Sequence, residues 1–352
     1  MTAGTEHRLG PDELTRHIGA AGRRAGRRRL LLLAGVGAVA ALAFGLELLL
    51  GGSSQIPLGD VLPAALGLQD GLNDYVVHQT RLPRALTAFL GGALFGLSGS
   101  LYQRLIGNPL ATPDVIGVTA GASTGAVLVL TVLGGTGLAV QSGALVGAVI
   151  AAIGIYLLSW RGGVDTYRLV LVGIGLGACC AALTSYLVTR MDQMTMERAM
   201  RWMMGSLNGS TWRDVAILSI TLLFGGCCVA LVSTGLANLS LGDDLARGLG
   251  SRVGWLRSGT LLLGAALAAM VTSVTGPIAF VALVAGPIAA RLMRLPDALL
   301  ASALIGGTIL AVSDVLAQSA PFISPVPTGT LTALIGAPVL IYLLVRGRPT
   351  SI

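Results

Sequence analysis

The sequence contains no lysine, because all 23 of its basic residues are arginine. The P-loop of ATP-hydrolysing enzymes requires a lysine, so this chain cannot hydrolyse ATP through that motif. Histidine is also scarce: His7, His17 and His78 are its three histidines, and all lie outside the long apolar runs. A zinc site within those runs would therefore have no histidine ligand. Since no nucleophile has a base nearby in the sequence either, we expect a protein that is not an enzyme, with no catalytic residue, metal or cofactor.

Charged residues make up only 11% of the chain, whereas hydrophobic residues make up 54%, which excludes an ordinary soluble domain. The apolar runs have the length that a helix needs to cross a bilayer, and they lack the alternation of a β-barrel strand. Ten runs are found, at residues 30–50, 82–104, 116–134, 138–160, 168–189, 212–234, 255–275, 278–294, 298–316 and 328–346. We predict an all-α polytopic membrane protein with about ten transmembrane helices. Residues 30–352 would form one transmembrane domain, preceded by a basic tail at 1–29.

The arginines predict the orientation of these helices. An even number of spans places both termini on one side, and 17 of the 23 arginines fall in the segments on that side. Because cytoplasmic loops are enriched in basic residues, we predict cytoplasmic termini in a multi-pass protein of the cytoplasmic membrane. The net charge of +7 then reflects topology, and nucleic acid is not an expected partner. The basic start also resembles a secretory signal, but the run that ends at Leu50 is long enough to span, and we assign it as the first helix.

Two patterns inside the runs suggest chemistry but are better explained by packing. Cysteines occur as adjacent pairs, Cys179 with Cys180 and Cys227 with Cys228. Neighbours on a helix point about 100° apart, so neither pair forms a metal clamp, and we predict buried packing residues. The GIGLGA stretch at 173–178 matches a dinucleotide-binding pattern, but that motif requires a preceding strand. We interpret it as a close helix contact.

Small-residue spacing of the same kind recurs along the chain, at Gly92 and Gly96. It predicts close approach between helices at these positions too.

Glu47 and Asp314 are the ionisable residues that come closest to the interior of the predicted spans. Such residues occur in proton- and sodium-coupled carriers, so an ion-coupled secondary transporter acting without an ATPase is the alternative function. Residues 82–160 and 255–346 also share an arginine-flanked helix followed by a Gly/Pro break, as repeated halves of such a carrier would. Our preferred interpretation is that both carboxylates are interfacial or hydrogen-bonded structural groups.

The longest predicted inner connection between spans lies at about 238–254 and has the pattern of a short helix. Ser240 and Asp243 have the spacing of a capping box, while glycines at 248 and 250 would end the helix. Leucines recur every four residues and give an apolar stripe, at Leu241, Leu245 and Leu249. The spacing leaves two interpretations open: the stripe binds a partner, or it packs on the chain's own bundle.

This segment carries the pattern L-G-D-D-x-A-x-x-L-G, which resembles the coupling segment of the FecCD family of iron-chelate and vitamin B12 type ABC importers. Other stretches resemble the same family from residue 30 to the end. They are R-L-P-R at 81–84, S-G-x-x-x-Q at 98–103, N-P-L-A-x-P at 108–113, G-x-x-x-G-A at 117–122, G-S-L-N-G-x-x-W at 205–212, G-P-I-x-F at 276–280, D-x-x-A-Q at 314–318 and T-A-L-I-G-A-P at 332–338.

The resemblance implies a type II ABC importer permease with the fold of the vitamin B12 permeases. It implies that an ABC ATPase dimer hydrolyses ATP and receives the coupling segment in its cleft. The residues assigned to ATPase coupling are Leu241, Gly242, Asp243, Asp244, Ala246, Arg247, Leu249 and Gly250. R-G-G-V-D-T-Y-R-L at 161–169 and F-V-A-L-V-A at 280–285 resemble the second permease subunit of ferric enterobactin and related importers. A heterodimer with a sister permease, a siderophore-binding protein outside the membrane and a ferric siderophore cargo are therefore expected.

By the same resemblance, Arg81 and Arg84 begin the second helix at the outer surface and pair with carboxylates of the binding protein. Anchoring at the lipid headgroups is the alternative for both. Asn108 and Pro109 are assigned to an inner turn near the ATPase, with a structural role favoured because proline removes a backbone donor.

The chain departs from the family's pattern in two places. A Pro-His-I-x-R stretch usual in the family is replaced by GPIAAR at 286–291, without histidine. An outer arginine near the end of the ninth helix is replaced by Gln318.

Overall fold

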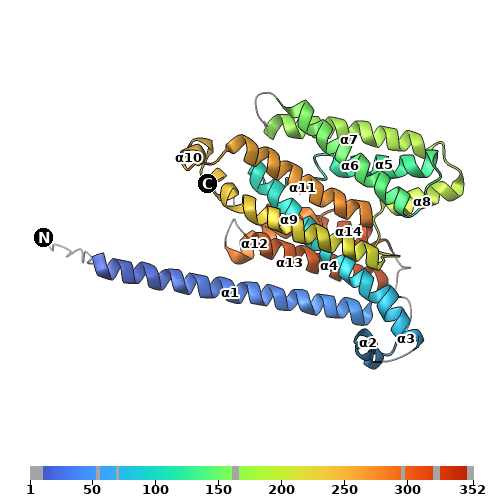
Figure 1. Cartoon of the computed structure of the whole chain (residues 1–352), viewed down its shortest axis with the longest axis horizontal. Coiled ribbons are helices and arrows are strands. Elements are labelled where there is room, and N and C mark those ends of the chain that lie inside the picture. The colour runs from blue at the N-terminus through green and yellow to red at the C-terminus, as the bar shows by residue number, and fades with distance from the viewer. Residues whose placement is uncertain are drawn as a thin grey trace.

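A computed structural model describes residues 11–52, 56–68, 71–160, 166–294, 298–319 and 326–346 of the chain. Each of the ten predicted runs is a helix (Figure 1). They are α1 (Pro11–Leu50), α4 (Leu82–Ile106), α5 (Val118–Val132), α6 (Leu138–Ser159), α7 (Thr166–Val188), α9 (Trp212–Leu239), α11 (Val253–Thr275), α12 (Val281–Met293), α13 (Leu299–Ser319) and α14 (Thr328–Arg346). Residues 1–10 of the predicted tail and 161–165 of one family-like motif lie outside the described residues.

The helix lengths confirm an all-α membrane protein. Among the described residues, 7 helical segments are long and apolar enough to cross a bilayer, by length and composition. Helices α5, α12 and α14 are apolar but shorter. At about 1.5 Å per residue, the 13 residues of α12 extend only part of the way across the hydrocarbon. The preceding irregular stretch, in which Gly276 and Phe280 have positive φ angles of 71° and 69°, continues the path beside the other helices.

The second span begins earlier than the sequence predicted. Two short helices precede it, α2 (Leu58–Ala65) and α3 (Leu72–Val76), and α3 runs through a π-helical turn at Val77–Arg81 directly into α4. Leu72–Ile106 is therefore one apolar span of 35 residues, and the predicted start at the outer arginines is wrong. Pro83 has no backbone N–H to donate to the preceding turn, and the widened π turn before it accommodates this proline within a continuous helix.

Helix α4 forms the centre of the bundle and packs against α9, α11, α12 and α13. Its glycines allow backbones to touch: a Cβ at Gly92 would lie 2.3 Å from the carbonyl oxygen of Gly306, and one at Gly96 2.2 Å from that of Ser302. The close approach predicted at Gly92 and Gly96 is thus confirmed, and it is the contact between α4 and α13.

Helices α5, α6 and α7 form a second layer beside α11 (Figure 1). In α7, a Cβ at Gly173 would lie 2.6 Å from the carbonyl oxygen of Ile116, in the turn that leads into α5. The GIGLGA stretch is therefore a close packing contact within the bundle, against the start of α5. The prediction that the cysteines are buried is wrong for three of the four, because Cys179, Cys227 and Cys228 are exposed on α7 and α9, while Cys180 is half-buried. These two helices lie at the periphery, and the rest of the chain leaves most of their apolar surface uncovered.

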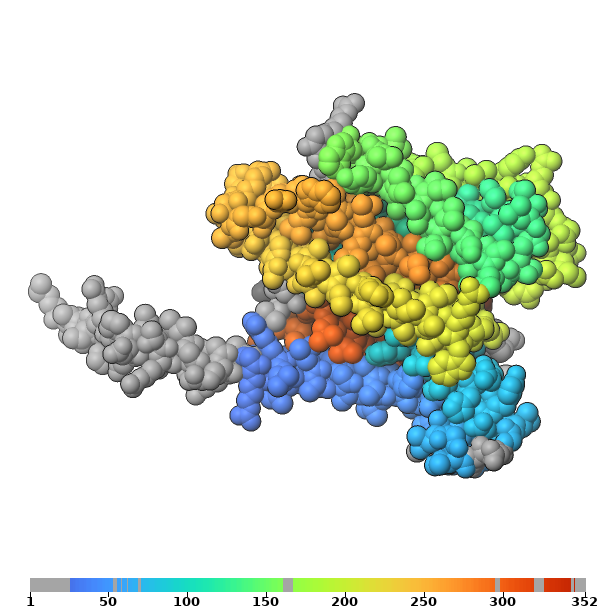
Figure 2. Space-filling view, in the orientation of Figure 1, coloured from blue at the N-terminus to red at the C-terminus, as the bar shows by residue number. Residues whose placement is uncertain are grey.

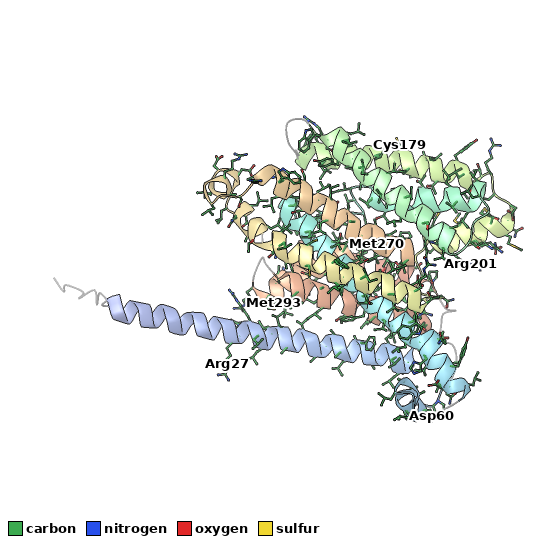
Figure 3. All side chains as sticks on the ribbon, viewed as in Figure 1. Arg27, Asp60, Cys179, Arg201, Met270 and Met293 are labelled. Carbon is green, nitrogen blue, oxygen red and sulfur yellow. The ribbon has the colours of Figure 1, made fainter. Side chains whose placement is uncertain are left out.

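The remaining short helices mark the two ends of the bundle. Helix α10 (Asp243–Gly248) projects from the left side of the packed bundle in Figures 1 and 2, whereas α2, α3 and α8 (Gln193–Met203) lie at its right side. Figure 3 places Arg27 and Met293 toward the α10 end, and Asp60 and Arg201 toward the other. Below, these are called the α10 end and the α8 end.

Candidate functional site

At the α8 end, Arg84 forms a buried ion pair with Asp314 across the contact between α4 and α13. Its Nε donates to Asp314 Oδ2 at 2.7 Å and its Nη2 to Oδ1 at 2.9 Å. The Asp314 side chain is 0% exposed, and Gln318 Nε2 and Thr328 Oγ1 also donate to it. Asp314 is therefore a hydrogen-bonded carboxylate that joins α4, α13 and α14, in line with the structural interpretation.

Arg81 lies one turn earlier and is also buried, with 5% exposure. Its Nη1 donates to the carbonyl oxygens of Leu49 and Leu48, at 3.0 and 3.3 Å, near the end of α1. Glu47, 2% exposed, lies nearby and accepts from Gln318 Nε2 at 3.4 Å. Both arginines predicted to dock a binding protein are thus bound within the chain, and a visiting carboxylate would have to compete with these partners.

A pocket of about 320 Å³ opens beside this ion pair. Its lining includes Arg84 together with Arg201, Ser206, Asn208 and Gln318, from four separate segments. Sequence reasoning missed Arg201, which lies on α8 with its side chain 71% exposed. The sequence feature that could have indicated it is the amphipathic stretch after Asp192, which forms α8 and contains Arg201.

Asp192 caps the N-terminus of α8. Its Oδ2 accepts from the backbone N–H groups of Met194 and Thr195, at 3.1 and 3.2 Å. Hydrogen bonds from Thr195 hold the pKa of Asp192 below its usual value. This capping fixes the start of the helix that presents Arg201.

At the other end of the bundle, α10 confirms the predicted short helix but not its predicted cap. Gly242 is the N-cap residue, with φ 98° and no side-chain capping bond. Ser240 Oγ instead donates to the carbonyl oxygen of Ala237 at 2.7 Å, so the capping box is wrong. Because Gly242 has a positive φ, the chain turns into α10 two residues after Ser240, which leaves that hydroxyl on the last turn of α9. The helix ends as expected, at Gly248, and Gly250 follows with φ 84°.

The leucine stripe of α10 and its flanks lies on the surface. Leu241, Leu245 and Leu249 are 56%, 62% and 60% exposed, whereas Ala246 is fully buried. The alternative in which the stripe packs on the chain's own bundle is therefore wrong. An apolar stripe on a projecting polar element is the surface expected of a docking site.

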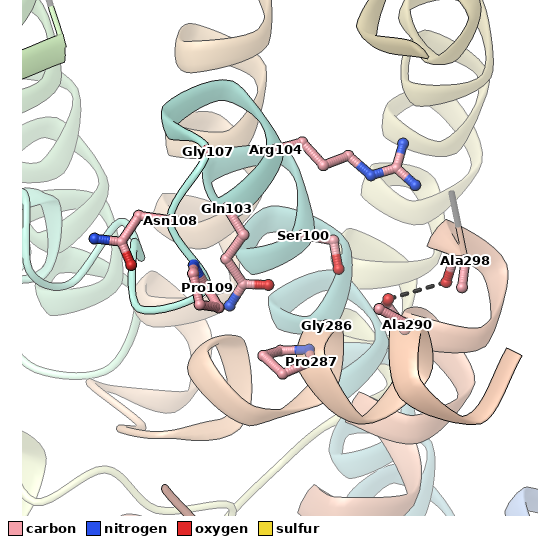
Figure 4. Close-up of a pocket in the computed structure, with 11 residues that line it drawn as sticks. Ser100, Gln103, Arg104, Gly107, Asn108, Pro109, Gly286, Pro287, Ala290 and Ala298 are labelled. Atoms are coloured by element: carbon pink, nitrogen blue, oxygen red, sulfur yellow. Dashed lines mark hydrogen bonds between the residues drawn. The ribbon is translucent and has the colours of Figure 1, made fainter. Parts of the chain in front are cut away.

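The inner turn follows α4 at the same end of the bundle as α10. Gly107 ends the helix with φ 69°, and Asn108 Oδ1 then accepts from Leu110 N at 2.9 Å. Pro109 and Asn108 line a cavity of about 180 Å³ together with Gln103 (Figure 4). The hydrogen bond from Leu110 supports the structural role favoured for Asn108.

The departure from the family's pattern at Gly286 lies in the wall of this cavity (Figure 4). A Cβ at Gly286 would lie 2.1 Å from Gln103 Oε1, while Gln103 Nε2 donates to the carbonyl oxygen of Leu283 at 2.9 Å. Glycine at this position therefore lets the Gln103 amide reach the backbone of α12.

The fold is that of a helical membrane protein whose α10 end carries a short helix with exposed leucines. Residues 38–346 match the FecCD transport family, and the chain belongs to that family. It is therefore a transport permease and not an enzyme; ATP hydrolysis takes place in a separate subunit. Membership of this ABC importer family implies an ATPase and a binding protein as partners, and a location in the membrane with several spans.

Individual relatives match over nearly the whole chain. The chain is 34% identical to the ferric enterobactin transport system permease protein FepG of Escherichia coli (strain K12), over 91% of this chain and 97% of that one. It is 37% identical to the probable siderophore transport system permease protein YfhA of Bacillus subtilis (strain 168), over 91% of this chain and 94% of that one. A solved ABC transporter described as metal-chelate type, in an inward-facing conformation, has a TM-score of 0.80 at 28% identity, over 90% and 99%.

Proposed function

We propose that this chain is the permease subunit of an ATP-driven importer that moves a ferric siderophore into the cytoplasm. The observation that carries the proposal is the match to the ferric enterobactin permease over 91% of the chain. The exposed leucine stripe of α10 supports it as a surface for the ATPase. A second permease of the same family would complete the pathway as a heterodimer. The peripheral faces of α7 and α9 are available for such a subunit.

The orientation follows from the arginine distribution. Helix α10 and the adjoining ends of α12 and α14 would face the cytoplasm, with both termini on that side. The ATPase would bind α10 through Leu241, Leu245 and Leu249, which are exposed in this chain. The binding protein would dock at the α8 end, where Arg84 and Arg201 line one pocket.

The alternative, an ion-coupled carrier, requires a carboxylate that is available to an ion. Asp314 accepts two hydrogen bonds from Arg84 and one each from Gln318 and Thr328. A carboxylate held by four donors is a poor exchange site for a transported cation, because each donor would have to be released in every cycle. This network favours the ATP-driven importer.

Reconstitution in liposomes tests the proposal. The chain would be reconstituted with its sister permease and ATPase, and uptake of iron-labelled ferric enterobactin measured with binding protein outside and ATP inside. We expect uptake that requires ATP, the ATPase and the binding protein. Labelled cobalamin and a ferric hydroxamate serve as competing cargoes. Uptake by the permease without the ATPase, driven by a proton or sodium gradient, would overturn the proposal in favour of the carrier.

A further inference from the structure

An ion pair links α10 to the first turns of α11. Asp243 Oδ1 accepts from Arg257 Nη2 at 2.9 Å, although the two residues are 14 positions apart. Both side chains are about one-third exposed, at 33% and 30%. The pair therefore joins α10 to α11 through side chains, in addition to the backbone segment that links the two helices.

The two adjacent aspartates of α10 have different surroundings. Asp243 pairs with Arg257 on α11 at 2.9 Å through Oδ1, and its Oδ2 lies 3.7 Å from Arg247 of α10. Asp244 has a fully exposed side chain, and its partner is Arg247 on the same short helix, at 3.0 Å. Both carboxylates lie in the first turn, where the helix dipole favours them equally. Their difference is thus one of direction: Asp243 faces the bundle, and Asp244 faces the solvent.

Helix α11 carries the Arg257 contact into the bundle. The next residue, Ser258, lies with its Oγ 3.3 Å from Tyr156 Oη of α6. One turn further, Tyr102 Oη of α4 donates to the carbonyl oxygen of Leu261 at 3.1 Å. Because a helix moves as a stiff element, a displacement at Arg257 reaches both α4 and α6.

We propose that Asp243 is a positioning residue that transmits movement of α10 to α11 through Arg257, while Asp244 belongs to the surface that the ATPase covers. This inference rests on the proposed function, since it concerns how ATPase closure moves the permease. The two aspartates of the L-G-D-D pattern, Asp243 and Asp244, then have different roles. The exposed leucines receive the force, and the Asp243–Arg257 pair passes it to the helix that contacts α4 and α6.

The test measures cargo imported per ATP hydrolysed by the complete reconstituted importer. Asp243→Asn and Arg257→Gln should each lower this ratio about two- to fivefold, the range expected when one partly exposed ion pair is lost. Asp243→Glu should retain the ratio, because it retains the charge. The charge swap Asp243→Arg with Arg257→Asp should recover at least half of it. Asp60→Asn, on α2 at the other end of the bundle, is the matched control and should leave the ratio within twofold of the parent. Asp244→Asn should weaken co-purification of the ATPase and lower the ratio less than Asp243→Asn does. All ratios refer to assembled complexes isolated by co-purification with the ATPase.

Two results would overturn the inference. One is an equal fall of the ratio for Asp243→Asn and Asp244→Asn, which would make both of them contact residues. The other is an unchanged ratio in both Asp243→Asn and Arg257→Gln. Failure of the proposed function gives a different result, because the parent importer would then show no ATP-dependent uptake of ferric enterobactin. Should the swapped variant not assemble, the comparison of Asp243→Glu with Asp243→Asn decides the question.

Discussion

Neutralising either member of the Arg84–Asp314 pair should destabilise the permease strongly, whereas neutralising both should cost less than the two single changes together. In Arg84→Gln, the Asp314 carboxylate keeps two neutral donors, from Gln318 and Thr328, but loses its cation. Removing one partner of a buried ion pair typically costs about 3–5 kcal/mol. In Asp314→Asn the cost should be lower, about 2–3 kcal/mol, because Arg84 borders a pocket and can reach water.

Equilibrium unfolding of the purified permease in mixed micelles measures these differences. The double variant, Arg84→Gln with Asp314→Asn, should fall short of the sum of the single costs by at least about 2 kcal/mol, since neither residue of the pair then leaves the other's charge without its partner. Arg198→Gln, an exposed arginine on α8, is the matched control and should change stability by less than about 0.5 kcal/mol. Additive costs within about 0.5 kcal/mol would refute the reasoning, because they would show that the two groups do not interact.

Three further predictions concern other parts of the fold. Leu245→Asp should abolish co-purification of the ATPase without lowering the stability of the permease, because that side chain is 62% exposed. Gly99→Ala should lower the free energy of unfolding by about 1–3 kcal/mol, because the new Cβ would lie 1.8 Å from a carbonyl oxygen of α12. Its control is Gly259→Ala, at a helix position with open space around it, which should be neutral or slightly stabilising. Burial raises the pKa of Asp114 to about 6, against a lowering hydrogen bond from Thr119, so its contribution to stability is lost as pH rises through 6. Asp114→Asn should therefore raise the melting temperature at pH 8 but not at pH 4.

Much of the architecture could be predicted because membrane helices are specified by composition. Ten apolar runs gave ten helices, since a chain in lipid must satisfy its backbone within each span. Contacts at Gly92 and Gly96 were also predictable, because small residues one turn apart mark a close helix face. Both features depend on spacing within a single helix, which the sequence displays directly.

What the sequence could not display is pairing across the fold. Arg84 and Asp314 are 230 positions apart, and their bond depends on how α4 crosses α13. The sequence position of an arginine such as Arg84, taken alone, is compatible with docking of a binding protein, with anchoring at the lipid headgroups or with an internal ion pair. The exposed cysteines were mispredicted for a related reason: apolar spans carry no sign of which face meets lipid and which meets the core.

The buried pair also changes how docking of a binding protein must be tested. A charge reversal at Arg81 and Arg84 removes partners of α1 and of Asp314, so lost docking could follow from an altered fold. Asp314→Asn combined with Arg84→Gln removes the guanidinium without leaving its partner's charge behind. If the permease with this double change still binds its binding protein, Arg84 serves the bundle alone. If binding is lost while the stability approaches that of the parent, the guanidinium itself is part of the docking surface.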